Sequence, residues 1–413
     1  MKRYHLSAFL ESPVAIRRDR QSDRSGGVHS IAGTLLRGSL AQLYLQQKGV
    51  VDDTFRSLFL DENACRFGPL DPSPRVYPQT ASACKRQRVD HGIVDLLWFR
   101  IAQHSLASDL PVDAEEPWRR CRKCGSDLKP LQGFWKEHQG QVDDVPDEHH
   151  SVAAHVGIDR VTMTAADSIF YTLESLDPHP EPLVGWIAAA EDVLDRLKTL
   201  LKEDHNTVYI GHHRTRGYGR VRLELNEQPQ PCHGSGASDS WDRWSQDLIA
   251  FLQRKPLGIP NLDAERDFFF TVSLPTGAIL LDELLRYSLD PASMSPELAP
   301  LPNPYDGLTS DQRPTRSVTG GGTLRCVAAV AKHERVRGWN AAHGLPRQDE
   351  WAVTRGSVYA YWFQGTRDQR EAFQRELLRL SQEGLGVRRN EGFGVVTISD
   401  DFHRRFCKQE AST

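Results

Sequence analysis

An internal repeat is the feature that most restricts how this chain can fold. Residues 211–221 and 386–396 share the pattern G-x-x-R-x-x-G-[aromatic]-G-x-V, which aligns Gly217-Tyr218-Gly219 with Gly392-Phe393-Gly394. In each copy, the pattern of apolar residues predicts an amphipathic helix before the repeat and a strand after it. A chain that repeats one unit in this way is expected to contain two similar halves.

The periodicity of apolar residues predicts both strands and helices in each half. Two halves that each end in a glycine-rich loop favour an α+β fold with two ferredoxin-like βαββαβ units in tandem, the fold of RNA-recognition-motif domains. Predicted strands cover residues 3–16, 155–160, 208–210, 221–225, 268–274, 324–331 and 357–363. Predicted helices cover residues 34–45, with Thr34 as the N-cap, and residues 183–201, 241–253, 280–289 and 368–380.

The length of 413 residues is enough for two domains. We expect an N-terminal ferredoxin-like domain over 1–230, a linker and helix over 231–264, and a C-terminal ferredoxin-like domain over 265–413. The linker prediction begins from the proline- and glycine-rich residues 226–240. Residues 61–150, which are rich in proline, are predicted to form an irregular insertion in the first domain.

The charge balance argues against a sequence-blind polycation. Lys and Arg number 51 against 55 Asp and Glu, for a net charge of −4, but basic residues cluster at 17–24, 85–88, 119–123 and 214–222. The N-terminus lacks the pattern of a signal peptide, and no apolar stretch reaches the length of a membrane span, so we expect a cytoplasmic protein. Seven cysteines, an odd number, argue against a disulfide framework.

The glycine-rich repeats have the chemistry of a phosphate-binding loop. Glycines allow positive φ angles and a close approach of backbone N–H groups to phosphate oxygens, while arginines donate charge-assisted hydrogen bonds. Tyr218 and Phe393 could stack on bases. Neither copy has the pattern of a nucleotide-hydrolysing P-loop or a dinucleotide fingerprint. The alternative is a tight turn with solvated arginines, and the presence of two equivalent copies favours RNA contact.

Several short motifs, in a fixed order, resemble the RAMP superfamily of CRISPR-associated proteins. They are the helix entry at 31–41 (IAGTLLRGSLA), the segments 55–59, 66–68 and 77–78, the strand 155–165 (HVGIDRVTMTA), the loop 211–219, and residues 338–340, 344–347 and 356–358. The combination is most similar to the Csx-ten family of type III-D interference complexes. Ala32 stands where that family often has proline.

The resemblance implies a non-catalytic subunit with a Cas-five-like role, which grips the 5′ repeat-derived handle of the crRNA. The implied partners are crRNA, target RNA indirectly, a Cas-ten-like large subunit and Cas-seven-like backbone subunits, with no membrane. Arg37 falls early in the first predicted helix, where a cation is disfavoured unless an anion lies beside it. The candidate RNA-binding residues are Gly33, Arg37, Arg160, Gly211, Arg214, Arg216, Gly217, Tyr218, Gly219, Arg389, Gly392, Phe393 and Gly394.

The cysteine spacing predicts a structural Zn²⁺ site in the insertion. Cys121 and Cys124 form a C-x-x-C-G-x-x-L knuckle, in which two thiolates bind one tetrahedral ion. Cys84 and His91, spaced C-x6-H, are the predicted remaining ligands, and the Csx-ten resemblance includes this segment. A redox dithiol is the alternative. Cys65, His104 and His138 compete as ligands, whereas Cys232, Cys326 and Cys407 are expected to be buried or idle thiols.

An endoribonuclease that processes precursor crRNA without a metal is the second functional hypothesis. His29, ahead of the first helix, could act as a general acid or base, as could His212 and His213 in the first glycine loop. No nucleophile, base and orienting residue are arranged together by the sequence, which favours a binding protein. A protein scaffold without RNA contact is a third possibility.

A cluster of aromatic residues lies in the second half of the chain. Strand aromatics usually pack inside a protein, so we expect these side chains to lie in the core. They are Trp339, Trp351, Tyr359, Tyr361 and Trp362.

Overall fold

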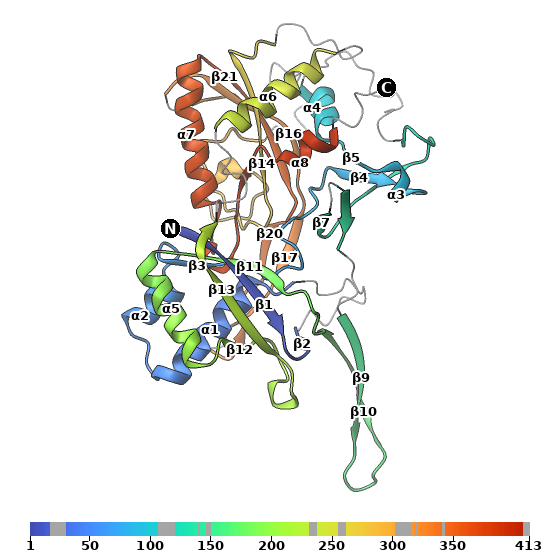
Figure 1. Ribbon diagram of the computed structural model, residues 1–413, viewed down its shortest axis with the longest axis vertical. Coiled ribbons are helices and arrows are strands. Elements are labelled where there is room, and N and C mark those ends of the chain that lie inside the picture. The colour runs from blue at the N-terminus through green and yellow to red at the C-terminus, as the bar shows by residue number, and fades with distance from the viewer. Residues whose placement is uncertain are drawn as a thin grey trace. The chain divides into compact units, whose positions relative to one another are not determined.

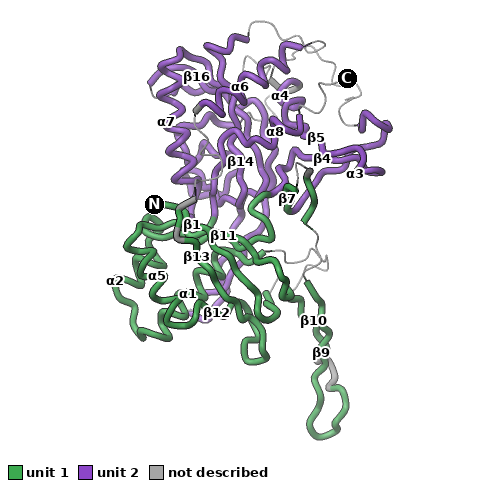
Figure 2. The backbone as a smooth tube through the Cα atoms, in the orientation of Figure 1, with its two compact units in different colours: residues 1–75, 134–231, 390–392 green, residues 76–133, 232–389, 393–413 purple. Residues whose placement is uncertain are grey.

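A computed structural model describes most of the chain, and its residues form two compact units, coloured separately in Figure 2. Unit 1 contains residues 1–75, 134–231 and 390–392, and unit 2 contains residues 76–133, 232–389 and 393–413. The predicted insertion at 61–150 therefore contributes to both units. The described residues are 1–16, 30–105, 120–138, 141–145, 150–230, 238–254, 262–301, 315–318, 320–340 and 343–407.

Unit 1 is built on a five-stranded antiparallel sheet (Figure 1). Its strand order is β12-β13-β1-β11-β3. The strands are β1 (Lys2–Leu10), β3 (Cys65–Phe67), β11 (Leu183–Ala189), β12 (Thr207–Tyr209) and β13 (Arg220–Gln230). The helices are α1 (Gly33–Lys48), α2 (Asp53–Phe59) and α5 (Glu191–Glu203), and the shorter strands are β2 (Val14–Ala15), β7 (Trp135–His138), β8 (Gln141–Asp144), β9 (His150–Ile158) and β10 (Ala165–Leu176).

One face of this sheet carries the core of unit 1. Tyr4, Leu6 and Ala8 alternate along β1 and are buried, because successive side chains of a strand point to opposite faces. Leu40 of α1 and Leu197 of α5 belong to the same apolar cluster. Both helices therefore cover the same face of the sheet, and each presents apolar residues at helical spacing to it.

Two predictions for unit 1 are wrong in detail. The helix predicted over 183–201 begins only at Glu191, because residues 183–189 form β11, which fills the gap between β1 and β3. The residue at the N-cap of α1 is Ala32 rather than Thr34, and it makes no side-chain capping bond. The strand predicted over 208–210 is confirmed as β12.

Unit 2 contains a second five-stranded antiparallel sheet, in the order β15-β16-β21-β14-β22. Its strands are β14 (Asp267–Ser273), β15 (Thr315–Ser317), β16 (Thr323–Val330), β21 (Val358–Gln364) and β22 (Thr397–Ile398). Helix α7 (Arg367–Glu383) packs on one face through Phe373, while α4 (Leu97–Ser105) and α6 (Ser238–Leu252) pack on the other. Neighbouring residues of β14 divide between the two cores, with Phe268 in one and Phe269 in the other.

The remaining elements of unit 2 are short. They are α3 (Arg88–His91) and α8 (Asp401–Cys407), a small sheet of β4 (Ala81–Cys84), β5 (Ile93–Asp95) and β6 (Leu128–Pro130), and two strand pairs made by β17 (His333–Val336) with β20 (Glu350–Val353) and by β18 (Trp339–Asn340) with β19 (Leu345–Pro346). None of the described helices in either unit is both long and apolar enough to cross a membrane.

Two predictions that concern the second half of the chain need correction. The helix predicted over 280–289 does not form: the Asp282 carboxylate accepts hydrogen bonds from the backbone N–H groups of Leu284 and Arg286, at 2.9 Å each, which stabilises a turn. Part of the predicted linker, residues 226–230, is the end of β13. The helix predicted over 368–380 is confirmed as α7, which ends at Gly384 with φ 77°.

Candidate functional site: the glycine loops and the cysteine cluster

The first glycine loop follows β12 and has an unusual backbone. Gly211, Gly217 and Gly219 have φ angles of 85°, 86° and 92°, and His213 has φ 60°. A single 3-10 turn, Arg214–Arg216, lies between the first and second glycines. Most residues with a side chain avoid these positive φ angles, so the glycine spacing of the sequence motif is a direct requirement of this backbone.

The second loop has the same backbone, residue for residue. Gly386, Gly392 and Gly394 have φ angles of 80°, 87° and 73°, and Arg388, the equivalent of His213, has φ 60°. The equivalent 3-10 turn is Arg389–Glu391. A constant offset of 175 residues relates all of these positions, so the sequence repeat is also a repeat of conformation.

Hydrogen bonds close the two loops in the same way. The backbone N–H of Ile210 donates to the carbonyl of Gly219 at 2.8 Å, and that of Leu385 donates to the carbonyl of Gly394 at 2.8 Å. These residue pairs are equivalent under the same offset. Each loop is also joined to a segment outside it: the Gly219 N–H donates to the Pro13 carbonyl, and the Gly394 N–H donates to the Gly277 carbonyl, both at 2.8 Å.

Close packing explains the first glycine of each loop. A Cβ atom on Gly211 would lie 2.3 Å from the carbonyl oxygen of Ala15, and one on Gly386 would lie 2.3 Å from that of Ile279. No side chain fits at either position without movement of the backbone. These two glycines are therefore required by the fold, whether or not RNA binds.

The arginines of the first loop are partly held by neighbouring side chains. Arg214 donates to the side-chain oxygen of Gln42 at 2.6 Å, and burial lowers the pKa of its guanidinium. Arg216, which is exposed, donates to the hydroxyl of Tyr171 at 2.5 Å. Tyr218 is half-buried and packs edge-on against His213. The loop therefore presents cations whose positions are already restrained.

In the second loop, an arginine makes a cation–π contact with the aromatic residue Phe393. The Arg388 guanidinium lies 5.1 Å from the ring centre of Phe393 and forms an ion pair with Glu350. Arg389 donates to the backbone carbonyl of Glu383 at 3.4 Å. Arginine is thus present in both loops, but its partners differ between them.

An anion does lie beside Arg37, and the protein itself supplies it. The Arg37 guanidinium donates to the Glu391 carboxylate at 2.6 Å, and the Thr34 hydroxyl donates to the same carboxylate at 2.8 Å. A Cβ on Gly33 would lie 2.3 Å from the carbonyl oxygen of Phe67. Packing and ion pairing inside unit 1 therefore account for Gly33 and Arg37 without a ligand.

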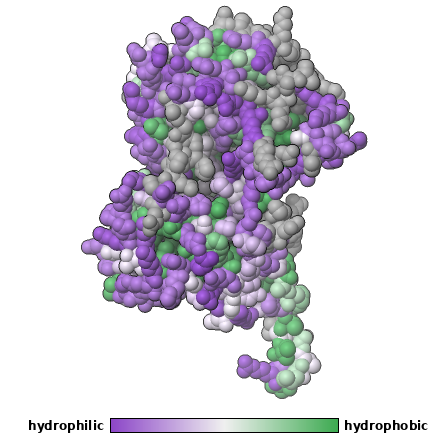
Figure 3. All heavy atoms as spheres, viewed as in Figure 1, coloured by the Kyte–Doolittle hydropathy of each residue, from purple (hydrophilic) through white to green (hydrophobic). Residues whose placement is uncertain are grey.

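The hairpin of β9 and β10 carries a feature that the sequence motifs missed. Every second residue of β9 from Val152 to Ile158 is exposed and apolar, and Phe170 on β10 pairs with Val156 and is also exposed. Figure 3 shows apolar surface along this hairpin. Arg160 is exposed in the turn that joins the strands. The alternation of apolar residues at 152–158 predicts a strand with one apolar side. It does not show that this side is exposed to solvent.

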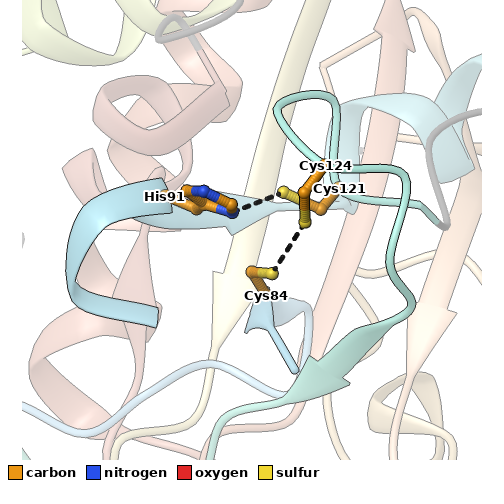
Figure 4. Close-up of side chains that lie close together, drawn as sticks. All are labelled: Cys84, His91, Cys121 and Cys124. Carbon is orange, nitrogen blue, oxygen red and sulfur yellow. Dashed lines mark hydrogen bonds between the residues drawn. The ribbon is translucent and has the colours of Figure 1, made fainter. Parts of the chain in front are cut away.

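The four predicted metal ligands lie together in unit 2 (Figure 4). The ligand atoms of Cys84, His91, Cys121 and Cys124 all lie within 4.8 Å of one another. The Sγ atoms of Cys84 and Cys124 are 3.5 Å apart, and the Cys121 Sγ is 3.2 Å from the His91 Nδ1. This Cys3His set is of a type that binds zinc.

A tight turn presents the two knuckle thiols. The Cys121 N–H donates to the Ser126 carbonyl at 2.6 Å, the Gly125 N–H donates to the Cys121 carbonyl at 2.7 Å, and Gly125 has φ 68°. Hydrogen bonds from Ser126 lower the pKa of the Cys124 thiol to about 6, whereas burial raises that of Cys121. A thiol with a low pKa is readily deprotonated, as a metal ligand must be.

The competing ligands are not part of this cluster where the structure describes them. Cys65 lies in β3 of unit 1, where burial raises its pKa to about 12, and His138 also belongs to unit 1. Cys326 and Cys407 are buried, as predicted. Cys232 and the His104 side chain lie outside the described residues.

Two of the three candidate catalytic histidines lie in the first glycine loop, where His212 is exposed and His213 is half-buried. His29 lies outside the described residues. A Ser–His–Asp line does occur in unit 2, where His403 lies 3.3 Å from the Ser273 Oγ and pairs with Asp95 through its other ring nitrogen. Both side chains of the His403–Asp95 pair are completely buried, so this arrangement holds α8 against β5 and cannot reach a substrate.

The fold and the site define an α/β protein with antiparallel sheets and a duplicated glycine-loop motif. The RAMP superfamily model matches residues 10–222, just over half of the chain. The chain belongs to the RAMP superfamily, which confirms the resemblance stated from its motifs.

The comparison with solved structures gives matches at low sequence identity and low TM-score. A chain of the type III-B Cmr-beta complex bound to cognate target RNA and AMPPnP is 10% identical, with a TM-score of 0.38 and coverage of 90% of this chain and 89% of that chain. Oligomeric Cmr4 from Pyrococcus furiosus is 13% identical, with a TM-score of 0.26 and coverage of 55% and 98%. No curated protein sequence matches the chain.

Proposed function

We propose that this protein is a non-catalytic RNA-binding subunit of a type III CRISPR effector complex. In this role it binds the 5′ repeat-derived handle of crRNA and connects a Cas-ten-like large subunit to Cas-seven-like backbone subunits. The observation that carries the proposal is the pair of glycine loops with one backbone conformation, in a member of the RAMP superfamily. A single glycine-rich turn can be explained by the needs of the backbone alone. Two loops with the same φ angles at equivalent positions favour a shared binding role.

The loops have the groups that RNA backbones need. Arg214, Arg216 and Arg389 lie in the 3-10 turns of the two loops and supply cations that can donate charge-assisted hydrogen bonds to phosphates. Tyr218 and Phe393 occupy equivalent positions and offer aromatic faces for base stacking. Arg160, at the turn of the β9–β10 hairpin, is a further candidate contact.

The strand order within each unit supports the proposal of two ferredoxin-like domains in tandem. In unit 1, β1, β3, β11 and β13 with α1 and α5 form a βαββαβ series, and in unit 2 β14, β16, β21 and β22 lie in the same relative order. Residues 274–301, the part of the chain described directly after β14, contain no α-helix.

The cysteine cluster is proposed to hold a structural Zn²⁺. Tetrahedral zinc with bonds of about 2.3 Å places its ligand atoms about 3.8 Å apart, close to the 3.2 and 3.5 Å separations measured here. The ion would fasten β4, α3 and the 121–124 turn together. Segments this short are poorly stable without such a cross-link.

The test is binding of a labelled RNA copied from the CRISPR repeat of the source genome. Arg214→Ala combined with Arg389→Ala should weaken binding at least about tenfold and reduce the salt dependence by about 0.7 per lost phosphate contact. Arg196→Ala with Arg367→Ala, which removes the same charge from exposed sites on α5 and α7, should leave both unchanged. Equal binding by both double variants would show that Arg214 and Arg389 do not contact the RNA, and a scaffold without RNA contact would show no specific binding even in the unmodified protein.

The same RNA tests the enzymatic alternative. Gel analysis after incubation should show intact RNA if the protein only binds. Site-specific cleavage that disappears in His29→Ala would establish the endoribonuclease instead.

A further inference from the structure

Two of the five clustered aromatic residues do not lie in the core. Tyr359, Tyr361 and Trp362 are buried in β21, as predicted, but Trp339 and Trp351 are 56% and 45% exposed. Both tryptophans belong to the ribbon of β17, β18, β19 and β20, residues 333–353 of unit 2. An exposed tryptophan offers a large, rigid aromatic face to a binding partner.

The outer face of this ribbon is aromatic and basic. Trp351 lies directly across from Arg335, and its ring centre is 6.1 Å from that of His333. Arg335 and Arg337 both form ion pairs with Asp349, which restrains them on the ribbon. Both arginines therefore lie on or next to the strand pair that carries Trp351.

The inner face turns towards the body of unit 2. Ala352, the neighbour of Trp351 along the strand, is completely buried. Glu350, on the same side, pairs with Arg388 of the second glycine loop, and Arg388 in turn lies over Phe393. The ribbon is therefore attached directly to the loop for which RNA contact is proposed.

We infer that the outer face of the 333–353 ribbon is a stacking site for a nucleotide of single-stranded RNA. The base would stack on Trp351, and its phosphates would contact Arg335 and Arg337. The inference rests on the proposed function, because the continuity with the second glycine loop identifies RNA as the ligand. The two arginines beside the tryptophan favour a ligand that carries phosphates.

The experiment uses the full chain and the repeat RNA substituted with 4-thiouridine. Trp351→Ala should weaken binding about 5- to 150-fold, and Trp351→Phe should keep most of the affinity because it keeps an aromatic face. Leu378→Ala, at an exposed apolar residue of α7, is the control and should bind normally. Ultraviolet crosslinking followed by trypsin should label the peptide from residue 348 to 355, which contains Trp351.

The outcomes separate this inference from the proposed function. Normal RNA binding by Trp351→Ala, with no label on peptide 348–355, would overturn the stacking site while the glycine-loop variants still lose affinity. If Trp351→Ala instead lost a protein subunit from the purified complex and kept its RNA, the face would be a protein interface and the inference would be wrong. Loss of affinity in Trp351→Ala with an unchanged melting temperature would support it.

Discussion

Gly392→Ala is a sharp test of the loop structure because the chain contains a matched control. Gly392 and Gly217 are equivalent and have φ angles of 87° and 86°, so alanine meets the same backbone strain at both. Their surroundings differ. A Cβ on Gly217 would meet no atom within 4 Å, whereas one on Gly392 would lie 2.6 Å from the carbonyl oxygen of Phe67.

The expected losses of unfolding free energy follow from the backbone strain and from the contact of the new Cβ atom. A left-handed conformation costs a non-glycine residue about 1–2 kcal/mol, and the stiffer unfolded chain of the alanine variant returns about 0.4–1 kcal/mol. Gly217→Ala should therefore lose about 1 kcal/mol of unfolding free energy. Gly392→Ala adds an overpacking cost of about 1–3 kcal/mol, because the carbonyl of Phe67 must move.

Urea unfolding followed by circular dichroism measures the difference. The free energy of unfolding should fall about 2–4 kcal/mol for Gly392→Ala, well beyond the loss for Gly217→Ala. Gly49→Ala, with φ 72° and open space around it, provides a second strain-only control. Losses that agree within about 0.5 kcal/mol at positions 217 and 392 would refute the close approach of Gly392 to Phe67.

Three further predictions concern buried charge and the metal. Elemental analysis should find about one zinc ion per chain in the unmodified protein and none in Cys121→Ser. The melting temperature of Cys121→Ser should fall by at least about 5 °C. An unmodified protein without metal would contradict the zinc proposal. Asp95→Asn should lose about 3 kcal/mol of stability, because it leaves His403 buried and unpaired. Burial opposes both charges, but their mutual attraction raises the pKa of His403 and lowers that of Asp95. The stabilisation by this ion pair should be complete between about pH 4 and 6.5. It should fall as the pH rises through the folded-state pKa of His403, and also in acid, where Asp95 becomes protonated. A loss of stability in Asp95→Asn that does not depend on pH would contradict this. Arg37→Ala should cost about 1–3 kcal/mol in urea unfolding because it removes the cation that pairs with the buried Glu391 carboxylate, and an unchanged midpoint would contradict the ion pair.

Local chemistry was readable from the sequence. Positive φ angles leave glycine as the favoured residue, so the spacing of Gly211, Gly217 and Gly219 records the backbone of the loop in the sequence itself. The metal cluster was predictable for a similar reason. Its knuckle is one short turn, and Cys84 and His91 are separated by a single strand end and a helical turn.

Other features depend on neighbours that no local pattern reveals. Residues 183–189 have helix-compatible spacing but form a strand, because β1 and β3 offer hydrogen-bonding edges on both sides. The predicted helix at 280–289 is replaced by a turn around Asp282. Trp351 and Trp362 look alike in the sequence, and only the packing of the sheet separates an exposed ring from a buried one.

The sequence by itself determined the repeat, the glycine-loop backbone, the superfamily and the Cys84–His91–Cys121–Cys124 cluster. Each of these depends on bonds and turns within a short stretch of chain, which residue type and spacing control directly. Only the tertiary structure decided that the anion beside Arg37 is Glu391, that the β9–β10 hairpin has an uncovered apolar face, and that Trp351 faces outward. These outcomes depend on which surfaces meet, and residues 354 positions apart carry no local signal of their contact.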